Sequence, residues 1–132
     1  MSTFERFEDI ESWQKARELT KAIYQATSKG EFAKDFALRD QIRRACISIM
    51  SNIAEGYSRG GNKEFINFLA IARGSTGEMK SQLYIALDLG YINQDSFTNL
   101  AQMATSIEKL IGGLIRYLQH SEKLGANREI SK

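Results

Sequence analysis

The apolar side chains of this chain recur at intervals of three and four residues over most of its 132 positions. This is the period of one face of an α-helix, and no segment shows the strict alternation of a half-buried β-strand. Proline, which breaks helices, does not occur in the chain. The sequence therefore predicts an all-α protein.

Four segments carry this helical period, and glycines follow several of them, as expected where helices end. The predicted helices run from Ile10 to about Ser28, from Asp40 to the segment "SRGG" at residues 58–61, from Asn62 to Gly90, and from Asp95 or Ser96 to Leu118. The residues that open the last three can cap a helix N-terminus with a side-chain oxygen. Short loops join the second helix to the third and the third to the fourth, so these neighbours must be antiparallel. We expect an antiparallel up-and-down four-helix bundle over residues 1–124 and a flexible C-terminal tail over residues 125–132.

The length and composition narrow the class of protein further. A chain of this size can bury one core, so a second domain is not expected. The 18 Lys and Arg residues against 16 Asp and Glu leave a net charge of only +2, so any charged partner surface must be local. Cys46 is the only cysteine, which excludes an internal disulfide and favours a reducing compartment. Because there is no secretion signal and no run of about 18 apolar residues, we expect a cytoplasmic protein without membrane contact.

Polar residues form a second face on the segment "RRACISIMSNIAEGYSRGG", which runs from Arg43 to Gly61. At 100° per residue its core positions lie on one arc, whereas five polar residues fall within about 80° on another. These are Arg44, Ser48, Asn52, Glu55 and Arg59. The third helix repeats the arrangement with Glu64, Ser75, Glu78 and Gln82. Two neighbouring helices therefore carry matched polar stripes.

Three interpretations of these stripes are open. In the first, the stripes are solvated faces with helical ion pairs such as Glu55 to Arg59, worth about 0.2–0.5 kcal/mol each. In the second, they form a polar network that joins the two helices or two subunits through hydrogen bonds and arginine–carboxylate pairs. The members of that network would be Ser48, Asn52, Glu55, Arg59, Ser75 and Glu78.

The third interpretation is a nucleic-acid site, in which basic side chains contact phosphates and a tyrosine stacks on a base. The candidate phosphate contacts are Arg39, Arg43, Arg44, Arg59, Lys63 and Arg73, and the candidate stacking residues are Tyr57 and Tyr84. Between Arg39 and Lys63 the basic residues outnumber the acidic ones by five to two. This local excess stands out in a nearly neutral chain.

Catalytic chemistry is not expected from this sequence. A metal-binding bundle would need Glu-x-x-His pairs on facing helices, and the single histidine, His120, lies near the end of the last helix. Cys46 lies on the core arc without a histidine nearby, as a buried structural thiol would. The glycine-containing segments lack the spacing of a phosphate-binding loop. We therefore predict a non-enzymatic protein with no metal and no cofactor.

Apolar residues also lie outside the core stripes of the first three helices, for example Ala22, Met50 and Ile66. Such an excess on several helices together indicates a second buried face. Gly112 and Gly113 lie in the middle of the last helix, where each costs about 1 kcal/mol relative to alanine. The pair is explained if another backbone approaches there, and local fraying is the alternative. Together these features predict a homo-oligomer.

The segments "RRACISIMSNIAEGYSRG" and "ARGSTGE" resemble the signature of a four-helix-bundle family first noticed as open reading frames in intervening sequences of 23S ribosomal RNA genes. The family's recurring residues correspond here to Arg44, Ala45, Ser48, Asn52, Ile53, Ala54, Glu55, Gly56, Arg59, Arg73, Gly74, Ser75 and Glu78. The similarity extends from "WQKARELTKAIY" through the fourth helix. The chain departs from the pattern at Met50, where the family often has proline, and at Arg39 and Asp40, where serine or threonine often opens the helix.

This resemblance implies a small bundle that assembles as a homopentamer and has no enzymatic activity. A distantly similar bundle is the accessory subunit of diversity-generating retroelements, which is thought to contact nucleic acid and a reverse transcriptase. The resemblance thus implies an interaction module whose partners are other copies of itself and structured RNA or DNA, or a reverse transcriptase. A purely structural homo-oligomer, or an adaptor that binds only protein, is the alternative.

Overall fold

The computed structural model describes the backbone of residues 4–131 and the side chains of residues 4–121. The chain forms the 3-10 helix η1 (Phe7–Asp9) and the helices α1 (Glu11–Ala26), α2 (Gly30–Lys34), α3 (Phe36–Ser58), α4 (Asn62–Asp88) and α5 (Gln94–Ser131). No strand occurs among the described residues, which confirms the predicted all-α class. Within this part of the chain, no helix combines the length and the apolar character that crossing a membrane requires.

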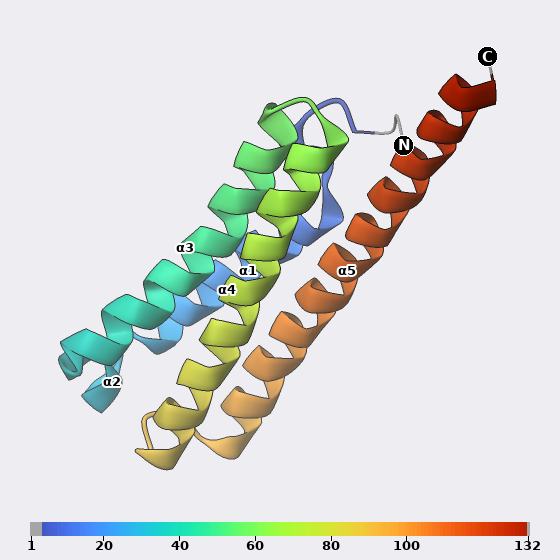
Figure 1. Cartoon of the computed structure of the whole chain (residues 1–132). Coiled ribbons are helices and arrows are strands. Elements are labelled where there is room, and N and C mark those ends of the chain that lie inside the picture. Colours follow the sequence, from blue (N-terminus) through green and yellow to red (C-terminus); the bar gives the residue numbers. More distant parts are fainter. Residues whose placement is uncertain (1–3, 132) are drawn as a thin grey trace.

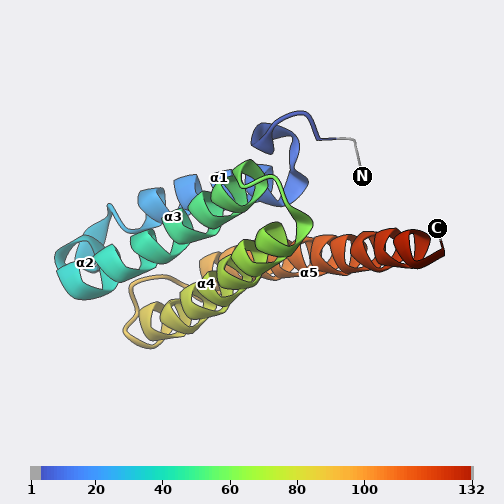
Figure 2. The same cartoon turned by 45° about the horizontal axis from the view of Figure 1, so that its top comes forward.

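The four long helices α1, α3, α4 and α5 form the predicted bundle (Figure 1). α3 packs on α4, α4 packs on α5, and α1 contacts both α3 and α5. α4 runs antiparallel to both α3 and α5, so α3 and α5 point in the same direction. The C-terminal end of α5 projects beyond the other helices (Figure 2). This helix includes residues 125–131, where the sequence predicts a flexible tail, and that flexibility stays a prediction.

The core is built from the apolar face of each long helix, as the three- and four-residue spacing predicts. Fully buried side chains include Leu19 and Ile23, Ile49 and Ile53, Leu69 and Leu83, and Ile107 and Ile111. Burial of each such side chain contributes roughly 1.5–3 kcal/mol relative to an exposed one. These four faces therefore hold the outward polar faces of α3 and α4 in fixed positions.

The second long helix begins earlier than predicted. Asp35 rather than Asp40 caps α3, because its Oδ1 accepts a hydrogen bond from the backbone N–H of Leu38 at 3.1 Å. Asp40 lies one turn inside the helix and pairs with Arg39 at 2.9 Å. The short helix α2, which the sequence pattern did not predict, leads the chain into the cap, with Phe32 buried.

The other two predicted caps are also displaced by a few residues. Gly61 is the N-cap residue of α4, and Asn62 is the first residue of the helix. At the start of α5, Oδ1 of Asn93 accepts a hydrogen bond from the N–H of Ser96 at 2.8 Å. Asp95 and Ser96 are therefore in the first turn rather than at the cap. The helices themselves are where the sequence places them.

Gly90 ends α4 as predicted. Its φ of +74° lies in the left-handed region, which glycine enters without the steric penalty of a β-carbon. The N–H of Tyr91 then donates to the carbonyl oxygen of Ala86 at 2.9 Å, so an otherwise open carbonyl at the helix end is satisfied. The chain can thus turn sharply into α5.

Candidate functional site between helices α3 and α4

A short set of hydrogen bonds joins α3 to α4 through three residues that we call the polar seam, namely Ser48, Asn52 and Ser75. The hydroxyl oxygens of Ser48 and Ser75 lie 2.8 Å apart, and either can donate. Nδ2 of Asn52 donates to the carbonyl oxygen of Ser48 at 2.8 Å and to its Oγ at 3.0 Å. Ser75 is buried and the other two are half-buried. The second interpretation of the stripes, a polar network between helices, thus describes these three residues.

The remaining residues of the predicted network, Glu55, Arg59 and Glu78, take part in two other contacts, one of them with the buried Gln82. Nη2 of Arg59 donates to Oε1 of Glu55 at 2.9 Å, and both side chains are half exposed. This is the solvated helical ion pair of the first interpretation, worth about 0.3–0.5 kcal/mol. Nε2 of Gln82 donates to Oε1 of Glu78 at 3.4 Å. Within the described contacts, neither pair bonds to the polar seam.

A shallow depression of about 410 Å³ lies beside the polar seam. It is lined by Gln41, Arg44, Ala45, Ile47, Ser48, Ser75 and Glu78. Arg44 and Glu78 form no ion pair with each other among the described residues. The depression therefore offers one charge of each sign, hydroxyl groups and an apolar wall to a side chain from outside.

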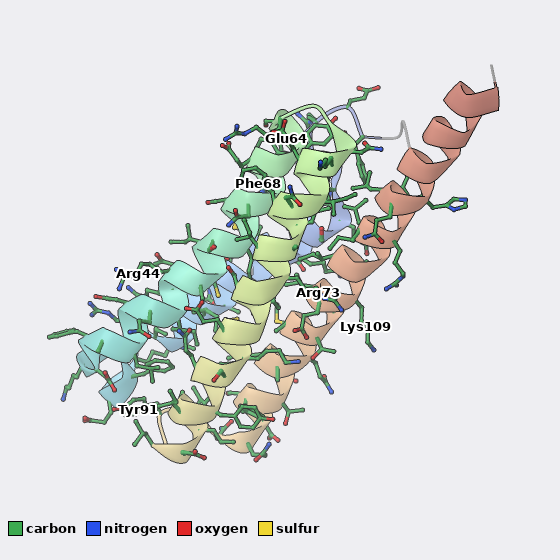
Figure 3. All side chains as sticks on the ribbon, viewed as in Figure 1. Arg44, Glu64, Phe68, Arg73, Tyr91 and Lys109 are labelled. Atoms are coloured by element: carbon green, nitrogen blue, oxygen red, sulfur yellow. The ribbon has the colours of Figure 1, made fainter. Side chains whose placement is uncertain are left out.

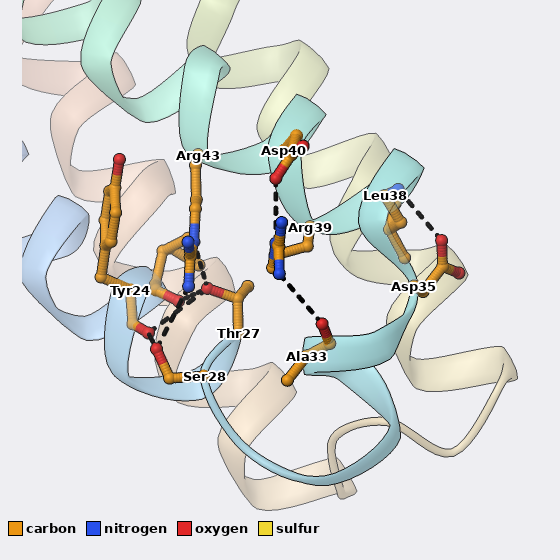
Figure 4. A network of polar contacts seen from close by, with 10 residues as sticks. Tyr24, Thr27, Ser28, Ala33, Asp35, Leu38, Arg39, Asp40 and Arg43 are labelled. Atoms are coloured by element: carbon orange, nitrogen blue, oxygen red, sulfur yellow. Dashed lines mark hydrogen bonds and ion pairs between the residues drawn. The ribbon is translucent and has the colours of Figure 1, made fainter.

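Two of the predicted phosphate contacts are engaged within the chain instead (Figure 4). Nε of Arg43 donates to Oγ1 of Thr27 at 2.8 Å, and its Nη2 donates to Oγ of Ser28 at 3.1 Å. The guanidinium group of Arg43 also lies 4.4 Å from the ring centroid of Tyr24. These contacts tie α3 to the end of α1.

Arg39 has a comparable structural role at the start of α3. Its Nη1 donates to the carbonyl oxygen of Ala33 at 3.1 Å, and its Nε donates to Oδ1 of Asp40 at 2.9 Å. The Arg39 hydrogen bond holds the pKa of the Asp40 carboxyl below its usual value. The charge of Arg39 is thus largely compensated. Sequence reasoning missed this role because the position of the Ala33 carbonyl group depends on the fold of the segment around α2.

Three other predicted contacts, Arg44, Lys63 and Arg73, are exposed and have no ion pair among the described residues. Figure 3 shows Arg44 on the outer side of α3 and Arg73 where α4 faces α5. The structure therefore divides the six predicted basic residues into two groups. Arg39, Arg43 and Arg59 hold contacts of their own chain, whereas these three form no ion pair among the described residues, although the charge of Arg44 also helps to lower the pKa of Asp40.

The glycine pair of α5 lies against Arg73. A β-carbon placed on Gly112 would lie 3.6 Å from Cζ of Arg73 and 3.5 Å from Nη1 of Arg116. At this position the structure shows side chains of the same chain, where the sequence predicted the approach of another backbone. Neither Arg116 nor this contact between α4 and α5 was found from the sequence.

The two candidate stacking residues differ in their availability. The hydroxyl of Tyr57 donates to the carbonyl oxygen of Phe4 at 2.7 Å, and its ring is half-buried. Tyr84 is 58% exposed, and its ring centroid lies 4.8 Å from that of Phe97. Of the two, Tyr84 is the one that can offer a ring surface to a partner.

The remaining reactive groups are placed as structural or surface residues. Cys46 is buried, and burial raises the pKa of its thiol to about 12, so the reactive thiolate is disfavoured. His120 is exposed near the end of the described side chains. Among the described residues, no three side chains of His, Cys, Asp or Glu come close enough together to hold a metal ion.

Comparisons with known proteins agree on one group of relatives. A family model described as 23S rRNA-intervening sequence protein matches residues 8–113. The chain is also similar to the crystal structure of a protein with unknown function from the S23 ribosomal protein family of Bacteroides thetaiotaomicron, with a TM-score of 0.73 and 27% sequence identity. That match covers 79% of this chain and 97% of the other. A comparison with curated proteins finds no significant match.

Proposed function

The chain belongs to the 23S rRNA-intervening sequence protein family, and from this membership we propose that it is a non-enzymatic, oligomeric module that binds RNA or DNA in the cytoplasm. The observation that carries the proposal is the set of exposed cations without a carboxylate partner on α3 and α4, namely Arg44, Lys63 and Arg73. Phosphates neutralised by Lys and Arg supply most of the affinity of such proteins for nucleic acid. Cations that are not already paired are best suited to that contact.

The descriptions of the relatives favour RNA over DNA as the ligand. The description of the family refers to 23S ribosomal RNA, and the structural relative is described as a member of a ribosomal protein family. Tyr84 adds an exposed aromatic ring on α4, which can stack on an unpaired base. A structured RNA with single-stranded loops would offer both phosphates and bases to these residues.

Assembly of several copies is the second part of the proposal, and the family resemblance gives five as the expected number. Ile47 and Ile71 are 43% and 53% exposed, and they lie on the two helices that carry the polar seam. A second copy would cover these apolar groups and could place a side chain in the depression beside Ser48. A closed ring would also repeat each basic residue, so that weak phosphate contacts act together.

The binding proposal is tested by filter binding of labelled structured RNA and duplex DNA at increasing salt. We expect retention at low salt and an affinity that falls steeply as salt rises. Replacing both Arg44 and Lys63 with glutamine should weaken binding and reduce the salt slope by about two. The control replaces Arg17 and Lys21 of α1, which removes the same charge from a helix that packs mainly on α3 and α5. Lack of retention at low salt, or an equal loss in the control, would contradict the proposal.

The assembly proposal is tested by light scattering after gel filtration. We expect a mass of several chains, and Ile71→Glu should shift it toward a single chain because a charge cannot be buried there without a partner. Phe36→Glu, which adds the same charge at a 63% exposed apolar residue beyond the seam, is the control. A single-chain mass for the unchanged protein at micromolar concentration rejects assembly, and a dimer rejects the pentamer.

A structural homo-oligomer, or an adaptor for a protein such as a reverse transcriptase, is the second candidate. It is favoured by the hydrogen bonds that Arg39, Arg43 and Arg59 form within the chain, because these bonds engage three of the six basic residues predicted to contact phosphates. Assembly without retention of either nucleic acid would support this candidate over the first.

A further inference from the structure

Two arginines from neighbouring helices meet over the glycine pair of α5. Nη1 of Arg116 lies 3.5 Å, and both Cζ and Nη2 of Arg73 lie 3.6 Å, from the point that a β-carbon of Gly112 would occupy. Nη2 of Arg116 lies 3.8 Å from the corresponding point at Gly113. The two guanidinium groups therefore lie close together on one turn of α5, although α4 supplies one and α5 the other.

Within the part of the chain whose side chains are described, no carboxylate pairs with either of these two charges. Among the acidic residues of α5 whose side chains are described, Glu108 is the nearest in sequence to Arg116, and it is already bonded to Lys80 of α4 at 2.9 Å. Glu78 of α4 is bonded to Gln82 and lies about 140° around the helix from Arg73.

A third cation extends the same surface. Lys109 is exposed and precedes Arg116 by seven residues, so both project from the same face of α5. Figure 3 shows Arg73 where α4 faces α5, and Lys109 on the outer side of α5. Like charges held this close repel one another, and an anion between them removes the repulsion.

We propose that Arg73 and Arg116, lying over Gly112 and Gly113, form a binding site for a phosphate group of a nucleic-acid backbone. This inference rests on the proposed function and names one contact through which it would act. A guanidinium group is a planar fork of donors that contacts two phosphate oxygens at once and stays charged at physiological pH. Two such forks from different helices can hold one phosphodiester from two sides. The glycines leave room for both groups directly on the helix surface.

The site is tested first by RNA binding with single substitutions. Arg73→Gln and Arg116→Gln should each weaken binding at least threefold more than Arg17→Gln, and each should lower the salt slope by about one. Arg73→Lys keeps the charge and loses the fork, so it should weaken binding with the salt slope unchanged. Circular dichroism should show unchanged helix content, because both arginines are exposed.

A second measurement separates the phosphate site from RNA binding as a whole. Inorganic phosphate is added to the protein at constant ionic strength, and the backbone amide signals of Gly112 and Gly113 are followed by NMR. We expect these signals to shift in the unchanged protein and not in the variant that carries both Arg73→Gln and Arg116→Gln.

The outcomes distinguish the two proposals. RNA binding that Arg73→Gln and Arg116→Gln reduce no more than Arg17→Gln does would overturn the site and leave the proposed function standing. Glycine signals that respond to phosphate, in a protein that retains neither RNA nor DNA, would support an anion site for free phosphate and overturn its assignment to nucleic acid. Signals that do not move, together with unchanged RNA binding in both variants, would overturn the site entirely.

Discussion

Helices α3 and α4 approach each other closely at Gly56. A β-carbon placed on this residue would lie 2.6 Å from Cβ of Phe68, 3.1 Å from Cδ1 of Phe65 and 3.4 Å from the carbonyl oxygen of Phe65. The first distance is far shorter than two carbon atoms tolerate. Because the obstructing atom is a β-carbon, fixed to the backbone of α4, a rotation of the phenylalanine side chain cannot relieve the contact. Gly56→Ala must therefore push the two helices apart.

The size of the effect follows from two opposing contributions. Overfilling a packed core costs about 1–3 kcal/mol, whereas alanine in place of glycine stabilises a helix interior by at most about 1 kcal/mol. We expect Gly56→Ala to lower the free energy of unfolding by about 1–2 kcal/mol. For a chain of this length the melting temperature should fall by roughly 3–8 °C.

Urea unfolding followed by circular dichroism at 222 nm measures this change directly. Gly74→Ala is the matched control, because a β-carbon there would meet no atom within 4 Å. It should raise the free energy of unfolding by about 0.5–1 kcal/mol. Light scattering of each variant at the same concentration would reveal a change of assembly separately. If Gly56→Ala is as stable as the unchanged protein, the close approach of the helices at this residue is refuted.

Two further predictions concern buried groups. Ser75→Ala removes the hydrogen bond of the polar seam that joins α4 to α3, and it should lower the free energy of unfolding in urea by about 0.5–1.5 kcal/mol. The control Ser81→Ala, on the exposed face of α4, should change this free energy by less than about 0.5 kcal/mol. Equal effects of the two substitutions would mean that the hydrogen bond between Ser48 and Ser75 adds nothing to stability. Cys46, whose pKa burial raises from 9.0 to about 12, should resist iodoacetamide at pH 8 in the folded protein and react after unfolding, as mass spectrometry can show. Because the unfolded thiol loses its proton above pH 9 while the folded one keeps it, stability should also fall from pH 9 toward pH 12, and rapid alkylation of the folded protein would contradict this assignment.

The periodic spacing of apolar residues was sufficient to predict the bundle, because burial of one face per helix is a property of each segment alone. The caps were less predictable. Asp35 and Asp40 are both suitable N-cap residues, and the choice between them depends on how α2 positions the chain before α3. A five-residue helix is too short to give a clear apolar period, so the feature that decides the boundary leaves little trace in the sequence.

The candidate site shows the same limit for polar residues. The helical wheel placed Ser48 and Asn52 on one face and Ser75 on the facing helix, and the structure joins all three. The wheel could not show that Arg43 reaches Thr27, because that contact depends on the angle at which α1 ends against α3. Spacing within one helix can be derived from the sequence, whereas the partner of a long side chain depends on how helices pack.

The glycine pair of α5 carries this argument one step further. Two adjacent glycines in a helix indicate that space is needed on its surface, and the sequence suggests a neighbouring backbone as the reason. The structure instead places the guanidinium groups of Arg73 and Arg116 over Gly112, and Glu108 of α5 is already bonded to Lys80. An ion pair within the chain would satisfy the arginines and make a role in binding unnecessary. Among the described residues, no ion pair includes Arg73 or Arg116, so their positive charge remains available. A ligand that carries a phosphate group is the partner whose chemistry fits this charge.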